Sequence, residues 1–570
     1  MTEQDKKQKT DIWQKYEKCK SYMEAKSVVT KTEKHWRFFV GDQWHGLKSG
    51  GEDFPMMNFI KPIVQYKIST VAQNTMTAVY TDMNHRTELA KVYEKLNKYW
   101  EQCWEKSKMT NMGWRVLKTA AIQGDTYTYW KDGNTMEPPQ MLSNTCVFLA
   151  DENIDDIQNQ PYVIVYERWS LEAAKQHAKD NGVSAEEIKL ITPDNRTETQ
   201  IYNKKEVEDK VTVLFYLEKK DGKVYAGRAT ESVVIEPVEI IQGERGGIDG
   251  ETMAMKALSV YPIIPYVWEN VPNSARGVGE VEQLIPNQLE ANKTLARRAM
   301  AVKMGAYPRL AYDANAIDNP EDLENVGSAI AVQGGGSQSI SQMISYLNPA
   351  NISSDADNLF NTLVQMSKDL AGATDYALGN INPEQASGTA IIAVRDQAQV
   401  PLNEQVARYR QWVEDVSLLW MDLWISYNPD GIDFEIEDDM GNVTPMHIDQ
   451  SELEKLKPTV RIDVSPDNQW TKLAEQQSLD GMLQNGLITL DEFADMIPDN
   501  SSVPKQKLLH VIEKRMAKEQ EMMMQQQIMM QGGMPQQGQS VTDIDPELVA
   551  QELLAQGIPE EEVQAIIQSL

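Results

Sequence analysis

Two helix-forming segments separated by a strand-like insertion constrain this chain most. Residues 279–304 (GEVEQLIPNQLEANKTLARRAMAVKM) and residues 353–371 are both rich in strong helix formers. Between them, residues 305–350 contain strand-like pieces and the flexible run Gly334-Gly-Gly-Ser337. We therefore expect two long helices joined by a small β element. Pro286 would distort the first helix unless the regular helix begins near that residue, where a first-turn proline is tolerated.

The rest of the chain alternates between helical and strand-like patterns. Apolar residues at three- and four-residue spacing predict helices over Asp11–Thr32 and Thr87–Gln123. Short β-branched and aromatic stretches then predict strands, interrupted by one helix at Leu171–Asn181. A long helix over Thr389–Tyr427 is expected to be interrupted at Pro401, and an acidic strand-rich stretch follows it. These patterns predict an α+β protein that is predominantly helical.

The composition is that of a soluble globular protein with a strongly acidic surface. Hydrophobic residues make up 41% and charged residues 25%, and the formal net charge is −30. Such a charge argues against a simple nucleic-acid binder, whose binding domain is normally basic. An acidic wall would still suit a conduit that passes DNA without holding it, and a solvated acidic surface is the alternative.

One stretch has the opposite charge from the rest of the chain. Between residues 291 and 312 every charged residue is basic: Lys293, Arg297, Arg298, Lys303 and Arg309. An all-positive helix in an acidic chain needs a negative neighbour, and DNA phosphates or an acidic protein partner would both serve. Pairing within the chain, with the acidic stretch 430–467, is the alternative.

Signatures of catalysis, metal binding and cofactor binding are missing or incomplete. The chain has no GxxxxGK[ST] loop, no HExxH, no GxSxG and no CxxC, and its histidines are scattered singly. Gly277-Val-Gly279 has only part of a dinucleotide fingerprint. The acidic residues from Asp151 to Asp156 suit either a divalent cation or a solvated turn. We expect no enzyme activity, no resident metal and no cofactor.

Cysteine usage and hydropathy predict the compartment. Cys19, Cys103 and Cys146 have neither metal-ligand spacing nor an even count, which indicates reduced thiols in a cytoplasmic product. The first residues lack the apolar stretch of a signal peptide, and no run approaches the roughly 18 apolar residues of a membrane span. We therefore expect synthesis in a host cytoplasm and no membrane partner.

Four short motifs, in this order along the chain, carry a family resemblance. They are Phe38-Phe-Val-Gly-Asp-Gln-Trp44, Asn58-Phe-Ile-Lys-Pro-Ile-Val64, the segment from Gly277 to Asn292, and Ser387-Gly-Thr-Ala-Ile391. Their order and spacing resemble those of the portal proteins of tailed bacteriophages, also called head-to-tail connectors.

The resemblance implies a fold with wing, stem, clip and crown regions, assembled as a closed ring. Carried onto this sequence, it implies the following regions: wing 1–278, first stem helix 279–304, clip 305–350, second stem helix 351–373, tunnel loop 374–388, a long kinked wing helix with wing strands 389–467, crown helices 468–530, and a flexible linker with a C-terminal helical hairpin 531–570.

The same resemblance implies where DNA and partner proteins would contact the chain. Residues expected at the DNA channel, on the first stem helix and the tunnel loop, are Lys293, Arg297, Arg298, Lys303, Tyr376, Asn380, Asn382 and Gln385. Residues expected at the clip interface are Tyr307, Arg309, Gly334, Gly335 and Gly336.

A portal protein is a passive conduit, so the resemblance implies a structural role in the virion. It implies a ring of about twelve copies at one capsid vertex, through which double-stranded DNA passes non-specifically during packaging and ejection. The implied partners are the terminase large subunit, head-completion or adaptor proteins, and the major capsid and scaffolding proteins. The alternatives are another virion component of the tail or baseplate, a metal-dependent nuclease and a cytoplasmic scaffold.

Overall fold

The structure is a computed structural model with a mixed α+β architecture. It describes residues 9–46, 54–84, 86–194, 209–246, 252–254, 256–306, 309–312, 344–347, 355–372, 400–428, 430–437, 443–456 and 458–466, and isolated residues between 314 and 319 and between 478 and 514. The chain divides into two compact units, Met1–Thr471 and Lys472–Leu570. Each unit is described by itself.

The N-terminal helical segment is two helices and not the single one that the sequence predicts. Helix α1 spans Asp11–Ala25, and the side chain of Thr10 caps it by accepting a hydrogen bond from the Trp13 amide. Helix α2 spans Val28–Val40. Between them Ser27 has a φ of 54°, in the left-handed region, which breaks the helical path.

The predicted helix over Thr87–Gln123 is divided in the same way. The 3-10 turn η2 (Thr87–Leu89) leads into α4 (Ala90–Lys106), and α5 (Met109–Gln123) follows after Lys108, whose φ is 55°. Helix α3 (Ile60–Ala72) packs against α5. A periodic apolar pattern continues through both breaks, so the sequence predicted the helices but not the turns between them.

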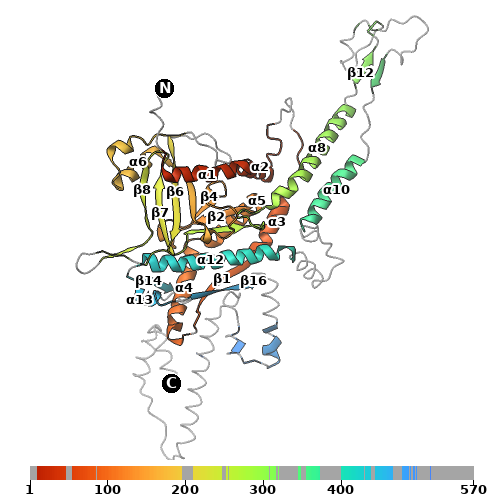
Figure 1. Cartoon of the computed structure of the whole chain (residues 1–570). Helices are drawn as coiled ribbons and strands as arrows, with labels where there is room; N and C mark the ends of the chain where they lie inside the picture. Colours follow the sequence, from red (N-terminus) through yellow and green to blue (C-terminus); the bar gives the residue numbers. More distant parts are fainter. Residues whose placement is uncertain are drawn as a thin grey trace, which may run out of the picture. The chain divides into compact units, whose positions relative to one another are not determined.

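A five-stranded antiparallel sheet with the order β4-β5-β6-β7-β8 forms one part of unit 1. Its strands are β4 (Val147–Leu149), β5 (Tyr162–Ser170), β6 (Lys210–Lys220), β7 (Lys223–Ala229) and β8 (Val234–Ile240). Helix α1 lies across one face (Figure 1), where its Tyr16 lies against Tyr166 and Trp13 belongs to the same apolar cluster. Helix α6 (Leu171–Asp180) packs through Ala174 and Ala178 beside β8. The other face belongs to the main core.

Smaller sheets connect distant parts of the sequence. Their strands are β2 (Asp125–Tyr129), β3 (Gln140–Ser143) and β11 (Ile263–Val267) in one sheet, and the pairs β1 (Asn74–Asp82) with β16 (Pro458–Pro466), β14 (Ile432–Glu437) with β15 (Val443–Ile448), and β9 (Glu244–Gly246) with β10 (Thr252–Ala254). Short helical elements are η3 (Lys131–Gly133), η4 (Ile157–Asn159), α7 (Ala185–Ile188) and α13 (Gln450–Leu453). The β1–β16 pairing joins the N-terminal helices to the last described strand of unit 1.

Helix α12 (Asn403–Tyr427) is the centre of the main core. Its tryptophans Trp412, Trp420 and Trp424 are all buried, within an apolar cluster that includes residues of α3, α4 and α5. Pro401 lies in the 3-10 turn η6 (Val400–Leu402) directly before α12, which fits an interruption at that point. The residues before Val400 in the predicted helix lie outside the described part of the chain.

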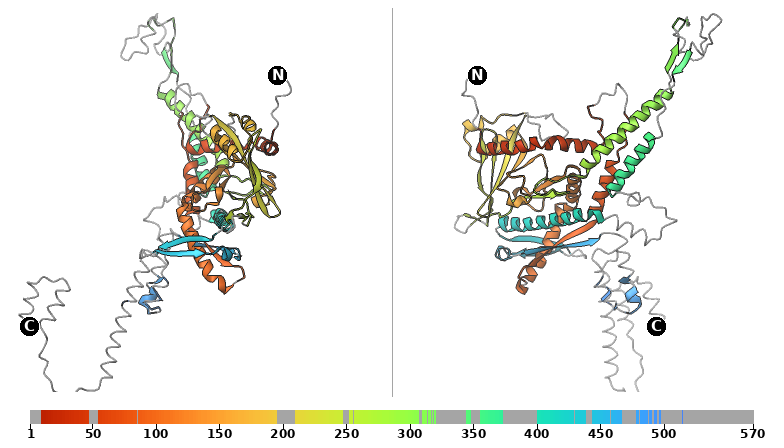
Figure 2. Two further views of the ribbon diagram at one scale, coloured as in Figure 1. Left: turned by 90° about the vertical axis from the view of Figure 1, so that its left-hand side faces the viewer. Right: turned by 45° about the vertical axis from the view of Figure 1, so that its right-hand side comes forward.

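The two helices that flank the β insertion are present and lie side by side. They are α8 (Glu280–Ala306) and α10 (Asp355–Leu370), and the strands β12 (Arg309–Tyr312) and β13 (Ile344–Leu347) pair between them (Figures 1 and 2). Helix α8 begins about two turns before Pro286, so of the two alternatives for this proline the regular helix does not begin near it and instead continues through it. Packing of this part of α8 against α2, α3 and α5 stabilises the helix beyond what its local sequence provides.

Only scattered residues of unit 2 are described. Thr489 and Glu492 bond reciprocally there: the Thr489 amide donates to Glu492 Oε2 at 2.8 Å, and the Glu492 amide donates to Thr489 Oγ1 at 3.4 Å. This is the capping-box arrangement of a helix start, and it agrees with helices in the region that the sequence predicted to be helical.

Candidate functional site

The first half of α8 is fixed to the rest of unit 1 by buried side-chain amides. Gln288 and Asn292 are one turn apart and almost wholly buried. Gln288 Oε1 accepts a hydrogen bond from the Phe59 amide at 3.1 Å, and its Nε2 donates to the Met57 carbonyl at 2.7 Å. Gln288 Nε2 also donates to Asn292 Oδ1 at 3.0 Å. The helix therefore supplies the acceptor that the amide of the buried residue Phe59 requires, and a donor to the carbonyl of the exposed residue Met57.

The same amide network extends to the end of α2. Asn292 Nδ2 donates to Gln43 Oε1 at 2.5 Å, and Gln43 Nε2 donates to the Phe38 carbonyl at 2.9 Å. Asn58 Nδ2 donates to the Phe39 carbonyl at 3.0 Å. The first three sequence motifs that resemble portal proteins thus meet at one place, and their polar residues hold α8 on α2 and α3.

A buried ion pair adds to this attachment at the first turn of α8. Lys67 Nζ lies 2.6 Å from Glu280 Oε1, and the two side chains are 11% and 3% exposed. A carboxylate in the first turn also interacts favourably with the helix dipole. The first half of α8 is therefore held by charged and neutral contacts together.

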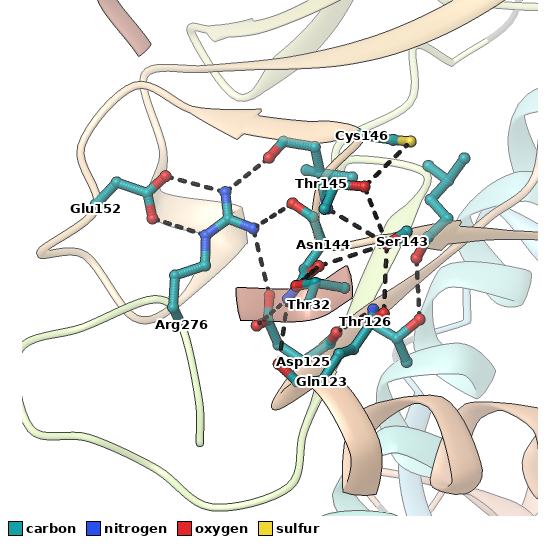
Figure 3. A network of polar contacts seen from close by, with 12 residues as sticks. Thr32, Gln123, Asp125, Thr126, Ser143, Asn144, Thr145, Cys146, Glu152 and Arg276 are labelled. Atoms are coloured by element: carbon teal, nitrogen blue, oxygen red, sulfur yellow. Dashed lines mark hydrogen bonds and ion pairs between the residues drawn. The ribbon is translucent and has the colours of Figure 1, made fainter. Parts of the chain in front are cut away.

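Directly before α8, Arg276 is the hub of a second buried network (Figure 3). Its Nε and Nη2 donate to the two oxygens of Glu152 at 2.9 and 3.0 Å, in a bidentate pair. Its Nη1 donates to the Asn144 carbonyl at 2.9 Å and to Asp125 Oδ2 at 3.3 Å, and its Nη2 donates to the Val147 carbonyl at 2.6 Å. One side chain thus links β2, the β3–β4 turn and the loop after β4 to the start of α8.

Burial and charge act together in this network. Burial raises the pKa of Asp125, and the adjacent Arg276 opposes that rise. Asp125, Glu152 and the Tyr127 hydroxyl hold the pKa of Arg276 well above its ordinary value, so the guanidinium stays charged. Because a buried charge that loses its partner is costly, the members of this network depend on one another.

The Gly277-Val-Gly279 pattern is explained by close main-chain packing. A Cβ added at Gly279 would lie 2.8 Å from the Ile122 carbonyl oxygen, and one added at Gly277 would lie 2.3 Å from a methyl carbon of Val267. Gly124, whose φ is +107°, would bring a Cβ within 2.3 Å of the Gly277 carbonyl oxygen. These glycines let the chain before α8 lie directly on the end of α5, which is a structural use and not that of a phosphate loop.

The second half of α8 carries the basic residues, and all four are exposed: Lys293, Arg297, Arg298 and Lys303. Two of them have an acidic partner on the helix itself. Glu290 Oε1 lies 3.3 Å from Arg297 Nη1, and Glu290 Oε2 lies 3.6 Å from Lys293 Nζ. Lys293 and Arg297 therefore pair with Glu290, which directly precedes the all-basic window, and not with the acidic stretch 430–467.

The four basic side chains do not form a single stripe. Arg297 follows Lys293 by four residues and shares its face, whereas Arg298 lies about 100° further around the helix. Lys303 lies about 80° from Lys293 around the helix axis, in the direction opposite to Arg298. A ligand on one side of α8 would therefore contact only part of this set.

Several predicted site residues lie outside the described part of the chain. They are Tyr307, Gly334, Gly335, Gly336, Tyr376, Asn380, Asn382 and Gln385. Arg309 is described as the first residue of β12, where it pairs with Leu347 of β13. The structure thus brings four of the predicted channel residues together on α8 and tests neither the tunnel loop nor the Gly334–Gly336 run.

The acidic residues after β4 are engaged in turn structure. Asp151 Oδ1 accepts from the Asn153 amide at 2.9 Å, and Asp156 Oδ1 accepts from the Gln158 amide at 2.9 Å. Glu152 is buried against Arg276. Among the described residues, no three acidic, histidine or cysteine side chains are placed to hold a metal ion.

The described histidines have separate environments. Burial lowers the pKa of His35, which therefore stays neutral at pH 7. His177 lies 3.0 Å from Glu236, and His447 lies between Asp433 at 2.7 Å and Asp449 at 3.0 Å. Each contacts a carboxylate or is buried, and none joins a group suited to catalysis in the described part of the chain.

Sequence reasoning missed the two buried networks. Arg276 and its partners Glu152 and Asp125 are far apart in the sequence, and no local pattern links them. Gln288 and Asn292 did carry a signal: they are amides at i and i+4 that interrupt the apolar face of a predicted helix. The buried side chains of Arg276, Gln288 and Asn292 thus connect segments that are distant in the sequence and hold the start of α8 in place.

Comparison with known protein families identifies the class to which this protein belongs. The chain belongs to the phage P22-like portal protein family, which matches residues 15–557. Members of this family are structural, non-enzymatic components of the phage capsid. No curated protein matched the chain. In the described part of the chain, no helix is long and apolar enough to cross a membrane.

Proposed function

We propose that this protein forms a closed ring of about twelve subunits at one capsid vertex and is the conduit for DNA during packaging and ejection. Membership of the portal family supports a capsid role, and the pair of helices α8 and α10 supports the ring. In this proposal α8 and α10 are the two stem helices, and β12 and β13 belong to the clip. The wing, tunnel loop and crown have the residue ranges that the family resemblance implies.

The observation that carries the ring is the exposed second half of α8 and its neighbour α10. Met300 and Val302 on α8 are 53% and 67% exposed, and Leu359 and Met366 on α10 are 46% and 58% exposed. Leu359 and Met366 share one face of α10, whereas Met300 and Val302 are two residues apart and lie on opposite sides of α8. Exposed apolar side chains on both sides of a helix pair would be covered where neighbouring copies contact it. In a ring of identical copies, that cover would be the α8 and α10 helices of the neighbouring subunit.

The charge of the chain fits passage of DNA without retention. A net charge of −30 disfavours lasting attachment to phosphates, and Lys293, Arg297, Arg298 and Lys303 are exposed on α8. We propose that these basic residues meet the DNA backbone or neighbouring stem helices through charge alone, with no base contacts.

The subunit itself hydrolyses nothing in this proposal. The terminase large subunit docks on the clip, residues 305–350, and drives the DNA, and head-completion or adaptor proteins later take the same place. Major capsid and scaffolding proteins contact the ring during assembly in the host cytoplasm.

Single-particle electron microscopy of the purified full chain, with native mass spectrometry, tests the proposal. We expect a closed ring of about twelve copies with a channel wide enough for a duplex. Where the protein alone stays monomeric, the measurement is repeated with scaffolding protein present. An open filament, or a compact monomer under both conditions, would contradict the ring and favour another structural role in the virion.

A further inference from the structure

Helix α5 exposes one face, and every charged residue on that face is basic. The helix itself contains no acidic residue, and Lys108 directly precedes it. The exposed residues lie within an arc of about 120° around the helix axis and over about 15 Å along it. These residues, called the α5 face below, are Lys108, Asn111, Trp114, Arg115 and Lys118.

The three cations of the α5 face have no carboxylate partner among the described residues. Lys118 instead lies over an aromatic ring of α2, with Nζ 5.6 Å from the centre of the Phe39 ring. The formal net charge of the chain is −30, so this face has the opposite sign from the chain as a whole. Unpaired cations at a surface attract a partner that carries negative charge.

An exposed tryptophan lies among these cations. Trp114 is 42% exposed, whereas the tryptophans elsewhere in the described part of the chain are buried or half-buried. Tryptophan and arginine are enriched among the residues that contribute most to protein–protein binding. A DNA duplex would pair with the cations but would place phosphates and sugars against the indole. An acidic protein surface with an apolar part matches both features of the α5 face.

The hairpin β14–β15 of this chain has a surface of that kind. The strand register puts Asp433 and Glu435 on the same side of the hairpin as His447. The other side, with Ile432 and Phe434, is buried. The exposed residues extend over about 20 Å from Val443 to Asp449, close to the length of the α5 face. These residues, called the hairpin face below, are Asp433, Glu435, Val443, Pro445, His447 and Asp449.

The hairpin face keeps a negative charge that the chain does not balance. His447 lies between two of its carboxylates, with Nδ1 2.7 Å from Asp433 and Nε2 3.0 Å from Asp449. One imidazolium balances at most one of these two charges. Glu435 has no cationic partner within the described residues. Val443, which is 54% exposed, supplies apolar area on the same face.

We propose that the α5 face of one subunit binds the hairpin face of a second copy of the chain. The inference rests on the proposed ring, and it names surfaces that join neighbouring subunits outside α8 and α10. A closed ring joins each subunit to its two neighbours through two different surfaces, and a basic and an acidic face on one chain meet that requirement. Between copies that each carry −30, a local contact of opposite sign offsets the general repulsion.

Carbodiimide crosslinking of rings of the full chain tests the pairing directly, because it joins a lysine to a carboxylate that contacts it. A mixture of isotope-labelled and unlabelled copies distinguishes crosslinks between subunits from those within one subunit. We expect crosslinks between copies from Lys108 or Lys118 to Asp433, Glu435 or Asp449, located by mass spectrometry. The inference is wrong if these two lysines crosslink only to other carboxylates, only within one chain, or not at all.

A charge-reversal variant measures the contribution to assembly. Lys108→Glu with Arg115→Glu makes both faces acidic, so rings should need at least about tenfold more protein in native mass spectrometry. Glu435→Lys added to that variant restores one opposite charge and should recover part of the loss. A control, Lys189→Glu with Lys223→Glu, makes the same charge change at exposed positions of other elements and should assemble like the unaltered protein. Thermal unfolding scans of the monomers show that each variant is folded.

The apolar part is tested by Trp114→Ser, which should weaken ring formation at low and high salt alike. The effect of the charge reversal should diminish as salt concentration rises. If the charge-reversal variant forms rings at the unaltered protein concentration, the inference is overturned and the ring proposal stays intact. Should that variant form rings normally but lose affinity for a short DNA duplex, the α5 face binds DNA instead. Failure of the unaltered protein to form rings, even with scaffolding protein present, would contradict the proposed function.

Discussion

The two halves of α8 have opposite environments within one continuous helix. Up to Asn292 its side chains bond to α2, α3 and the segment before α3, and the amides of Gln288 and Asn292 are buried. From Lys293 onward the basic residues and the apolar residues Met300 and Val302 are exposed. The first half is specified by contacts within the chain. The second half has the composition of a surface that contacts other molecules.

This difference predicts that substitutions in the two halves will be detected by different measurements. Changes at the first half should lower the free energy of unfolding of the isolated subunit. Changes at the second half should leave unfolding almost unaltered and change assembly or DNA passage. The following experiments test that division, beginning with the largest expected effect.

The largest effect is expected for Arg276→Met, at the residue that anchors the segment directly before the first half of α8. Removing the guanidinium leaves Glu152 and Asp125 buried without a counter-charge, at a cost of about 3–5 kcal/mol in the free energy of unfolding. Urea denaturation of the monomer measures it. Arg297→Met, at an exposed arginine of the second half, is the matched control and should change unfolding by less than about 1 kcal/mol. Equal losses for the two variants would break the comparison.

A smaller loss is expected for Gln288→Ala. The amide of the buried residue Phe59 would lose its acceptor, which costs about 1–3 kcal/mol, and the Met57 carbonyl would lose its donor. Gln283→Ala removes a glutamine from an exposed position of the same half, with the loss of one hydrogen bond to Glu280 Oε1 at 3.0 Å, and should cost less than about 1 kcal/mol. A neutral result for Gln288→Ala would mean that the amide network does not hold the helix.

The sequence predicts some features of the two halves of α8 and not others. The helix was predicted over residues 279–304 and is observed over Glu280–Ala306, because its helix formers and apolar spacing act locally. The pairing of β12 with β13 agrees with the strand-like pieces predicted there. The sequence left open whether the regular helix continues through Pro286, since that depends on packing against helices that are far away in the sequence.

The site residues show the same limit. The basic residues of the second half were identified from the sequence, because the residue type alone determines the sign of the charge. Glu290 was overlooked as their partner, although it precedes Lys293 by only three residues, because it lies just outside the all-basic window. The bonds from Arg276 to Asp125 and Glu152 join segments with no shared pattern, so only the folded chain reveals them.

A third experiment concerns charge in the second half. Lys293→Gln with Arg297→Gln should change the free energy of unfolding by less than about 1 kcal/mol, because these are exposed ion pairs. The expected effect is on DNA packaging or ring formation, and it should diminish as salt concentration rises. Packaging and assembly that match the unaltered protein at low salt would show that these charges have no such role.

The smallest effect on unfolding is expected for Met300→Ser with Val302→Ser. Both side chains are more than half exposed, so the monomer should change by no more than about 0.5 kcal/mol. Ring formation should weaken, because the proposed stem contacts lose apolar area. Assembly at the original protein concentration would indicate that these side chains face solvent or DNA in the ring.

The burial of the thiols has a practical consequence for observing such a ring. Cys19 and Cys103 are buried and Cys146 is half-buried, and burial raises the pKa of Cys103 and of Cys146 to about 11. The pKa of Cys19 is raised as well. Since the thiolate is the reactive form, maleimide reagents at neutral pH should leave all three largely untouched. A single cysteine introduced at Val302 would then carry the only fluorophore, and energy transfer between labelled subunits would follow each ring as it closes.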